Sequence, residues 1–467
     1  MRHKILVLLA LVVFGHCSFS ANQSNPSAER SPNIILILAD DLGYGDVGFL
    51  GQETIQTPNI DRFAGEGMRF TNFYAGSTVC APSRSVLMTG QHTGHTLIRG
   101  NAKTNLRPED VTVAEILKEA GYATALIGKW GLGHEGSTGV PTRQGFDFFF
   151  GYLDQTHAHN YFPTFLLRNE ERLLLDNIVP SEGKFGQGQA SEKKVYSPDL
   201  MIEEALKFID ENKDRPFFLY FATTLPHANN EAGVQGMEIP DYGIYSTRNW
   251  PEPQKGLAAM ISRLDKDIGR IMDAVQKAGI DENTFLFFSS DNGPHAEGGN
   301  DPDFFNSNGP FQGIKRALYE GGIRVPTFVR WPGQVKGGSE TSHVAYLGDF
   351  MATAAELAGI KVPAEAVDSI SFLPVALGEE QRQQTHSYLY WEFYERGSAQ
   401  AVRMGNWKAV RTPMLTGEIE LYNLSLDIGE TTNLAEQHPD IVEQIRQIME
   451  DAHEPSPLWK VPDQTGS

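Results

Sequence analysis

Hydrophobic positions along this chain fall into two alternating patterns. The segment Asn33 to Ala39, NIILILA, is an apolar run of strand length, which is typical of a strand buried on both faces. Further runs of this kind predict strands over residues 123–127, 216–221, 284–288 and 325–331. Between them, apolar residues at helical spacing predict helices over residues 113–120, 199–212 and 257–275. This alternation predicts an α/β fold, in which helices sandwich a large and mostly parallel sheet.

The pattern changes near residue 386, where short segments joined by turns replace the longer elements. These segments predict strands over residues 387–393, 401–404, 407–411 and 418–422, followed by a helix over residues 440–452. We therefore expect a main domain over residues 32–380. A C-terminal subdomain over residues 381–467 should hold a small antiparallel sheet and one helix.

The first residues have the pattern of a secretory signal peptide over residues 1–20, with a basic start and an apolar run from Ile5 to Phe14. A polar linker over residues 21–31 follows. The apolar run is shorter than the about 20 residues that a membrane span needs. We therefore expect an exported protein, periplasmic or secreted, without a stable membrane span. A lipid anchor at Cys17 is disfavoured by His16, which precedes it.

Composition excludes one class of function and draws attention to one cysteine. The chain has 39 basic and 59 acidic residues and a net charge of −20, which argues against a general nucleic-acid binder. Its two cysteines are Cys17 and Cys80, and removal of the signal peptide would leave Cys80 alone. A single cysteine in an exported protein is either a buried, inert thiol or a group with a special chemistry.

Polar side chains follow the predicted strands at the points where the strands end. In open parallel sheets, ligands bind beyond the carboxyl ends of the strands, so these side chains should meet at one rim. They are Asp40, Asp41, Lys129, His227, Asp291 and Asn292. The oxygen donors among them suit Ca²⁺ or Mg²⁺. Asp, Asn and Gly also favour turns, but two such motifs at strand ends favour a metal site over two turns.

Cys80 opens the segment Cys80-Ala81-Pro82-Ser83-Arg84, just before a predicted helix. The start of a helix favours negative charge through its free amide groups, and Arg84 adds positive charge one turn away. This position would activate a group at residue 80 or hold an anion there. Papain-like thiol catalysis would leave the metal-type carboxylates without a role.

This segment, followed by Met88-Thr89-Gly90, is similar to the signature of the type I sulfatases of the alkaline phosphatase superfamily. The resemblance extends over nearly the whole chain after the signal peptide. Its further motifs, in order, are Ala39-Asp40-Asp41-Leu42-Gly43, Thr57-Pro58-Asn59-Ile60-Asp61, Gly128-Lys129-Trp130, Pro226-His227, Ser290-Asp291-Asn292-Gly293, Lys315 and Gly405-Asn406-Trp407-Lys408. The resemblance implies an alkaline phosphatase-like fold and a sulfuric ester hydrolase.

The resemblance also implies the chemistry of the site. A maturation enzyme would oxidise Cys80 to formylglycine, an aldehyde whose hydrate supplies the nucleophile. The metal would be Ca²⁺, which residue 80 also approaches, and its ligands would be Asp40, Asp41, Asp291 and Asn292. Arg84 and Lys129 would hold the hydrate and its charge. His227 and Lys315 would contact the sulfate and assist departure of the alcohol, with His227 as the expected proton donor.

One position departs from the family pattern. Many sulfatases read Gly-Lys-Trp-His-Leu-Gly, where the histidine helps to deprotonate the hydrate, and here Gly131 replaces that histidine. His159, in Ala158-His159-Asn160-Tyr161, is our predicted substitute, with His134 and His157 as weaker candidates. We expect His295 at the rim to contact the substrate. We expect the same of Glu392 and Arg403 in the C-terminal subdomain, because polar side chains suit the hydroxyls of a sugar ring.

The sequence is compatible with three functions. The main hypothesis is a Ca²⁺-dependent sulfatase that acts on a sulfated saccharide. The second is a phosphate or phosphonate ester hydrolase of the same fold. The third is an inactive member that only binds glycans, which the missing histidine at Gly131 would permit but which the intact Cys80, Arg84, Lys129, His227 and Lys315 argue against.

Overall fold

The computed structural model of the protein describes residues 31–461. The predicted signal peptide, with Cys17, and all but the last residue of the predicted linker lie outside the described residues. Within the part that is described, no helix is both long and apolar enough to cross a membrane.

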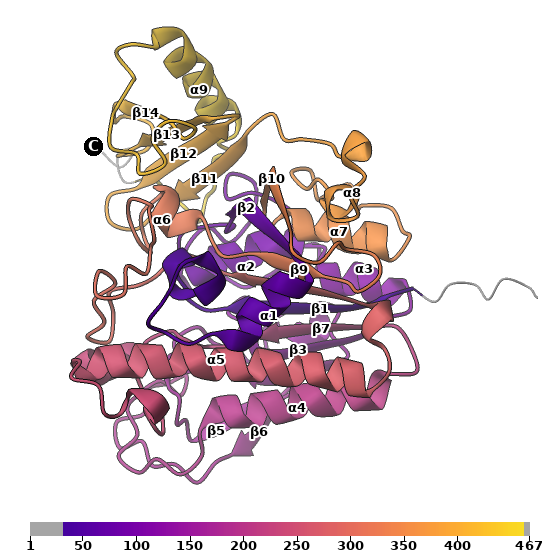
Figure 1. Ribbon diagram of the computed structural model, residues 1–467. Helices are drawn as coiled ribbons and strands as arrows, with labels where there is room; N and C mark the ends of the chain where they lie inside the picture. Colours follow the sequence, from indigo (N-terminus) through magenta and orange to yellow (C-terminus); the bar gives the residue numbers. More distant parts are fainter. Residues whose placement is uncertain (1–30, 462–467) are drawn as a thin grey trace, which may run out of the picture. The chain divides into compact units, whose positions relative to one another are not determined.

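The main sheet of the described chain has ten strands in the order β10-β2-β9-β8-β1-β7-β3-β4-β5-β6 (Figure 1). The strands are β1 (Asn33–Ala39), β2 (Met68–Tyr74), β3 (Ala123–Lys129), β4 (Phe148–Tyr152), β5 (Phe165–Arg168), β6 (Glu171–Leu174), β7 (Phe217–Ala222), β8 (Thr284–Ser290), β9 (Phe328–Arg330) and β10 (Ser339–Tyr346). The central strand β1 runs parallel to both of its neighbours, β7 and β8. The mostly parallel sheet that the sequence predicts is therefore confirmed.

Helices cover both faces of this sheet. They are α1 (Pro58–Glu66), α2 (Cys80–Thr89), α3 (Val113–Glu119), α4 (Ser197–Asn212), α5 (Glu252–Lys277), α6 (Glu320–Ile323), α7 (Asp349–Leu357) and α8 (Leu373–Ala376). Alternate residues of β1 point to opposite faces, as the geometry of a strand requires. Ile35 and Ile37 pack in one apolar cluster with residues of α1, α4 and α5. Leu36 packs in a second cluster, with residues of α2, α3 and α7.

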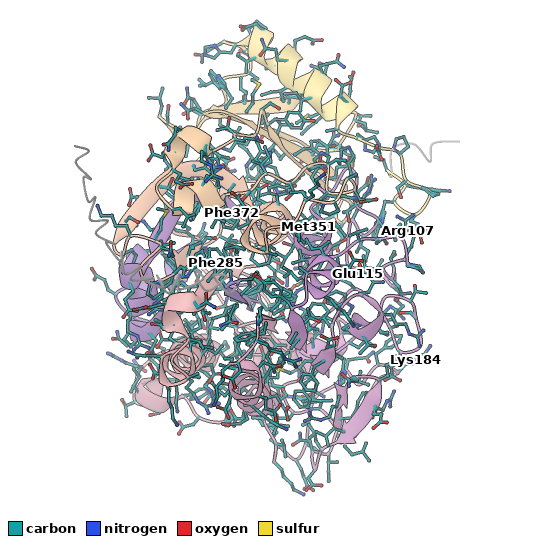
Figure 2. The ribbon with its side chains drawn as sticks, turned by 90° about the vertical axis from the view of Figure 1, so that its right-hand side faces the viewer. Arg107, Glu115, Lys184, Phe285, Met351 and Phe372 are labelled. Carbon is teal, nitrogen blue, oxygen red and sulfur yellow. The ribbon has the colours of Figure 1, made fainter. Side chains whose placement is uncertain are left out.

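The second cluster lies deep in the protein. Phe285 of β8, Met351 of α7 and Phe372 belong to it and occupy the interior in Figure 2. Because both faces of the sheet are buried, the central strands carry apolar residues on both sides, which explains their unbroken apolar runs.

A second sheet in the described part of the chain has four antiparallel strands in the order β11-β12-β13-β14, with α9 packed against it (Figure 1). The elements are β11 (Leu389–Phe393), β12 (Ala399–Met404), β13 (Trp407–Arg411), β14 (Ile419–Asn423) and α9 (Pro439–Asp451). Trp391 joins this sheet to the main one, because its Nε1–H donates a hydrogen bond to the Ala75 carbonyl at 2.9 Å. The predicted antiparallel sheet with one helix is therefore confirmed.

Several elements differ from the sequence prediction. The strand predicted over residues 325–331 is shorter, and as β9 it runs antiparallel to β8 and β2. Strands β2, β4, β5, β6 and β10 were not expected. β6 and β10 are the two edge strands of the sheet, and their exposure explains why they were not predicted. β6 is exposed throughout, and β10 is buried only at its end. Such segments lack the apolar run that marks a buried strand.

Candidate active site

The rim of the main sheet brings two pairs of polar residues together. Asp40 and Asp41 follow β1, Asp291 and Asn292 follow β8, and the register pairs Ala39 with Ser290. The backbone N–H of Asp41 donates to Asp291 Oδ1 at 3.1 Å. Asp41 adopts a φ of 66°, a left-handed conformation that is uncommon for residues other than glycine and that is found at functional sites. The predicted convergence of these side chains is confirmed.

Helix α2 directs Cys80 toward the same rim. Cys80 is the first residue of the helix, whereas the sequence predicted that its segment lies just before the helix, and its Sγ–H donates to Asp40 Oδ1 at 3.4 Å. Arg84 lies one turn further on, where its guanidinium donates to Asp291 Oδ2 at 2.8 and 3.1 Å. It also donates to the Lys129 carbonyl at 2.7 Å. All these groups are fully buried, so their charges interact strongly.

Two lysines complete the charge pairs. Lys129, the last residue of β3, donates to Asp40 Oδ2 at 2.7 Å. Lys315 donates to Asp41 Oδ2 at 2.7 Å and to His227 Nε2 at 3.2 Å. Glu297, which the sequence analysis did not single out, accepts a third bond from Lys315 at 3.2 Å. The site is therefore a buried group in which cations and carboxylates alternate.

His227 is held as a neutral ring with a defined orientation. Its Nδ1–H donates to the Ala228 carbonyl at 2.7 Å, which leaves Nε2 as the acceptor for Lys315. Burial, followed by the positive charge of Lys315, lowers the pKa of His227 well below its usual range. In this arrangement His227 Nε2 carries a lone pair that accepts the hydrogen bond from Lys315.

The electrostatics argue against a free thiolate at Cys80. Burial raises the pKa of the Cys80 thiol well above its usual value, by more than the nearby Lys129 lowers it. Burial would also raise the pKa of Asp40, but Lys129 and the other cations outweigh burial and hold that pKa well below its usual range. Burial thus favours the protonated thiol at Cys80, beside a carboxylate whose pKa is lowered.

The carboxylate and amide oxygens at the rim are donors that suit a hard divalent cation. Ligand atoms of Asp40, Asp41, Cys80 and His227 lie within 4.8 Å of one another and could hold a metal ion. Asn292 Oδ1 is buried and has no hydrogen-bond partner among the described residues, while its Nδ2 donates to Asp41 Oδ1 at 2.6 Å. A buried acceptor without a donor is costly, and a cation beside it would remove that cost. Carboxylate and amide oxygens are the ligands of Ca²⁺ and Mg²⁺.

Comparison with known proteins decides the family. Residues 32–360 match the family model described as Sulfatase. This protein belongs to the sulfatase family. A second match, over residues 311–454, is to the C-terminal region of N-sulphoglucosamine sulphohydrolase. Membership in this family identifies the protein as a sulfuric ester hydrolase, and the fold and the signature at Cys80 are consistent with it.

Relatives of this sulfatase span nearly its whole length. N-acetylgalactosamine-6-O-sulfatase of Bacteroides thetaiotaomicron is 31% identical over 96% of this chain and 98% of its own. N-acetylgalactosamine-6-sulfatase of Rattus norvegicus is 32% identical over 89% of this chain and 79% of its own. The crystal structure of Ps i-CgsB superposes with a TM-score of 0.76 at 28% identity, and covers 91% of this chain and 94% of that one. The alkaline phosphatase-like fold is thereby confirmed.

The structure places two predicted histidines beside His227. The His159 ring stacks on the His227 ring with a centroid distance of 4.9 Å, and its Nδ1 faces Glu231 at 3.1 Å. The His295 ring lies 6.1 Å from that of His227. Both nitrogens of His295 contact backbone, namely the Pro226 carbonyl at 3.3 Å and the N–H of residue 297 at 3.0 Å. These backbone contacts leave His295 little capacity to bind a substrate.

The structure does not bring Glu392 and Arg403 to this site. Glu392 is fully buried, and its partners are Tyr390, Tyr394, Arg99 and His453. The Arg403 guanidinium lies 5.1 Å from the centre of the Tyr74 ring and donates to Asn72 Oδ1 at 3.2 Å. None of these partners belongs to the group around Cys80. Both side chains join the second sheet of the sulfatase to neighbouring segments, which sequence alone did not reveal.

Two amide side chains near Cys80 were not predicted from the sequence. The Ala81 N–H donates to Asn101 Oδ1 at 3.0 Å, and the same oxygen accepts from Gln155 Nε2 at 3.4 Å. Asn101 lies in a loop without a motif, and Gln155 comes shortly after the end of β4, a strand that the sequence did not predict. Gln155 matters because it adjoins Gly131, the position at which the sulfatase departs from its family.

Proposed function

We propose that this sulfatase hydrolyses sulfate esters of sugars, using formylglycine made from Cys80 and a Ca²⁺ ion. The observation that carries the proposal is the position of Cys80. Its Sγ lies at the start of α2, 3.4 Å from Asp40, within the buried group that holds Arg84, Lys129 and Lys315. Because the thiol itself is protonated there, a modified side chain explains the site better than a thiolate nucleophile does.

The charged residues suit a sulfate ester. Hydrolysis spreads negative charge over the sulfate oxygens and the leaving oxygen, and preorganised cations stabilise that charge. In our proposal Arg84 and Lys129 hold the modified side chain, while Lys315 faces the sulfate. Ca²⁺, held by Asp40, Asp41, Asp291 and Asn292, would add positive charge that polarises the ester. A hydrated aldehyde would supply one hydroxyl for attack and a second for release of sulfate.

Lys315 and His227 would serve the leaving alcohol. The 3.2 Å hydrogen bond between Lys315 Nζ and His227 Nε2 places a donated proton between the two groups. Transfer of that proton through His227 to the leaving oxygen would restore a neutral alcohol.

The His227→Ala variant should therefore discriminate between leaving groups. We expect a loss of about 10²- to 10⁴-fold in turnover on a sulfated sugar, whose alkoxide needs a proton, and a much smaller loss on an aryl sulfate. Steady-state kinetics on both substrates test this, with His134→Ala as a matched control, because His134 pairs with Asp154 instead. Equal losses on the two substrates would contradict the proton-donor role.

The relatives support a sugar substrate. Their names specify N-acetylgalactosamine sulfatases, and Ps i-CgsB has been solved in complex with k-i-k-neocarrahexaose. We therefore propose a sulfated saccharide as the substrate, with 6-sulfated N-acetylgalactosamine first in the panel to be tried. A formylglycine-generating enzyme would be a further partner, required only for maturation.

A panel of esters tests the proposed function. The protein, made together with a maturation enzyme, should release sulfate from at least one sulfated saccharide, as measured by ion chromatography. Phosphate monoesters and phosphonate esters carrying the same aryl group form the comparison. Faster release of phosphate than of sulfate throughout the panel would favour the phosphoesterase alternative, and binding without release of either anion would favour the inactive glycan binder.

A further inference from the structure

Gly131 is bordered by a single side chain. A Cβ built at position 131 would lie 2.5 Å from Gln155 Oε1, and apart from Gly131's chain neighbours no other residue in the described range 31–461 comes within 4 Å of it. Gly131 also has a φ of 81°, which favours glycine over other residues. The space that a side chain at position 131 would use is therefore occupied by the amide of Gln155.

The orientation of this amide follows from its partner. Asn101 Oδ1 accepts from the Ala81 N–H at 3.0 Å, so it is fixed as an acceptor next to the residue after Cys80. Gln155 Nε2 donates to that same oxygen at 3.4 Å. With its nitrogen facing Asn101, Gln155 presents Oε1 toward Gly131.

Gln155 Oε1 lacks a donor. The atom is buried and has no hydrogen-bond partner within the described part of the chain. An acceptor buried in this way costs about 1–3 kcal/mol if nothing bonds to it, so such atoms in folded proteins usually have a partner. The described residues supply no donor for this atom, which leaves it open to a donor from a ligand or from water.

We propose that Gln155 Oε1 is a hydroxyl-binding group of the active site. The hydroxyl comes either from the hydrated side chain at position 80 or from the sugar, since both carry O–H donors and Asn101 ties Gln155 to the start of α2. This inference rests on the proposed function. It also separates two roles, because an amide accepts a hydrogen bond but takes up no proton. Gln155 orients the hydroxyl, and its deprotonation belongs to another group.

Reaction with methoxyamine tests whether the hydroxyl belongs to the hydrated side chain at position 80. This probe forms an oxime with the free aldehyde and not with its hydrate, and intact mass reports the labelled fraction. If Gln155 stabilises the hydrate, Gln155→Met should be labelled about 2- to 10-fold faster than the parent enzyme, as expected for the loss of one hydrogen bond. Gln155→Glu keeps an acceptor oxygen and should be labelled more slowly than Gln155→Met.

Steady-state kinetics distinguish a hydroxyl of the sugar from a hydroxyl of the hydrated side chain. Loss of a bond to the hydrate should lower kcat on sugar and aryl sulfates alike with KM unchanged, whereas loss of a bond to the sugar should raise KM for the sugar alone. Gln189→Met is the matched control, because Gln189 Nε2 donates to the Gln235 amide at 3.3 Å outside the site. Thermal unfolding of each variant confirms that it folds.

The outcomes separate the inference from the proposed function. If the parent enzyme is not labelled at all, the aldehyde is absent and the proposed function fails. If the parent is labelled but Gln155→Met matches it in labelling, kcat and KM, then Gln155 binds no hydroxyl of consequence and the inference is overturned. Faster labelling, or a rise in KM for the sugar alone, supports it and identifies the source of the hydroxyl.

Discussion

Replacing Cys80 with serine should lower kcat on sulfate esters by at least about 10⁴-fold while leaving the protein folded. Serine can attack sulfur once, but it lacks the second hydroxyl through which a hydrated aldehyde releases sulfate. The oxygen is slightly smaller than sulfur and keeps the donor that faces Asp40 at 3.4 Å, so the local packing should hardly change. Steady-state release of sulfate measures the loss, and thermal unfolding measures the fold.

Thr89→Ser is a suitable control for this variant. Thr89 lies at the other end of α2, where its hydroxyl donates to the Ser85 carbonyl at 2.8 Å. This change should leave kcat within about twofold of the parent value, as is usual for substitutions away from a site. Activity of Cys80→Ser within tenfold of the parent would show that no aldehyde is needed.

Removal of Ca²⁺ should abolish turnover and lower the melting temperature. Three buried carboxylates and the unpartnered Asn292 Oδ1 form the proposed ligand set, and a ligand that binds the folded state alone stabilises it. At a free Ca²⁺ concentration about 100-fold above Kd, the stabilisation is about 2.7 kcal/mol. Calorimetry with Ca²⁺ and with a chelator should show this difference, and added Ca²⁺ should restore both properties.

Two asparagine variants separate the metal site from general packing. Asn292→Ala should weaken the dependence of the melting temperature on Ca²⁺. Asn33→Ala, at the opposite end of β1 where Asn33 donates to Thr284 at 3.2 Å, should lower stability but keep the full dependence. If the chelator changes neither the melting temperature nor the activity of the parent protein, the calcium proposal is contradicted.

The parts of the site that lie on strands could be predicted from the sequence. Apolar runs locate the buried strands, and parallel strands bring their carboxyl ends to one rim, so Asp41 and Asp291 meet although 250 positions separate them. The start of α2 at Cys80 follows the same logic, because its signature and the apolar residues after it mark a helix beginning near the rim.

The parts carried by loops could not be predicted. Gln155 and Asn101 lie in segments without periodicity, and their contact depends on the path of two loops. Glu392 was expected to contact the substrate because polar side chains of the C-terminal subdomain suit the hydroxyls of a sugar ring. In the structure Glu392 is buried among Tyr390 of its own strand, Arg99 of a loop and His453, which follows α9.

The mass of residue 80 tests the central claim most directly. Trypsin should release the peptide from Phe70 to Arg84, which contains Cys80, from protein made with a maturation enzyme. We predict a peptide that has lost one sulfur and two hydrogen atoms and gained one oxygen atom, as conversion of a thiol to an aldehyde requires. An unmodified cysteine in all of the protein, in a preparation that still releases sulfate from sulfated sugars, would contradict the account.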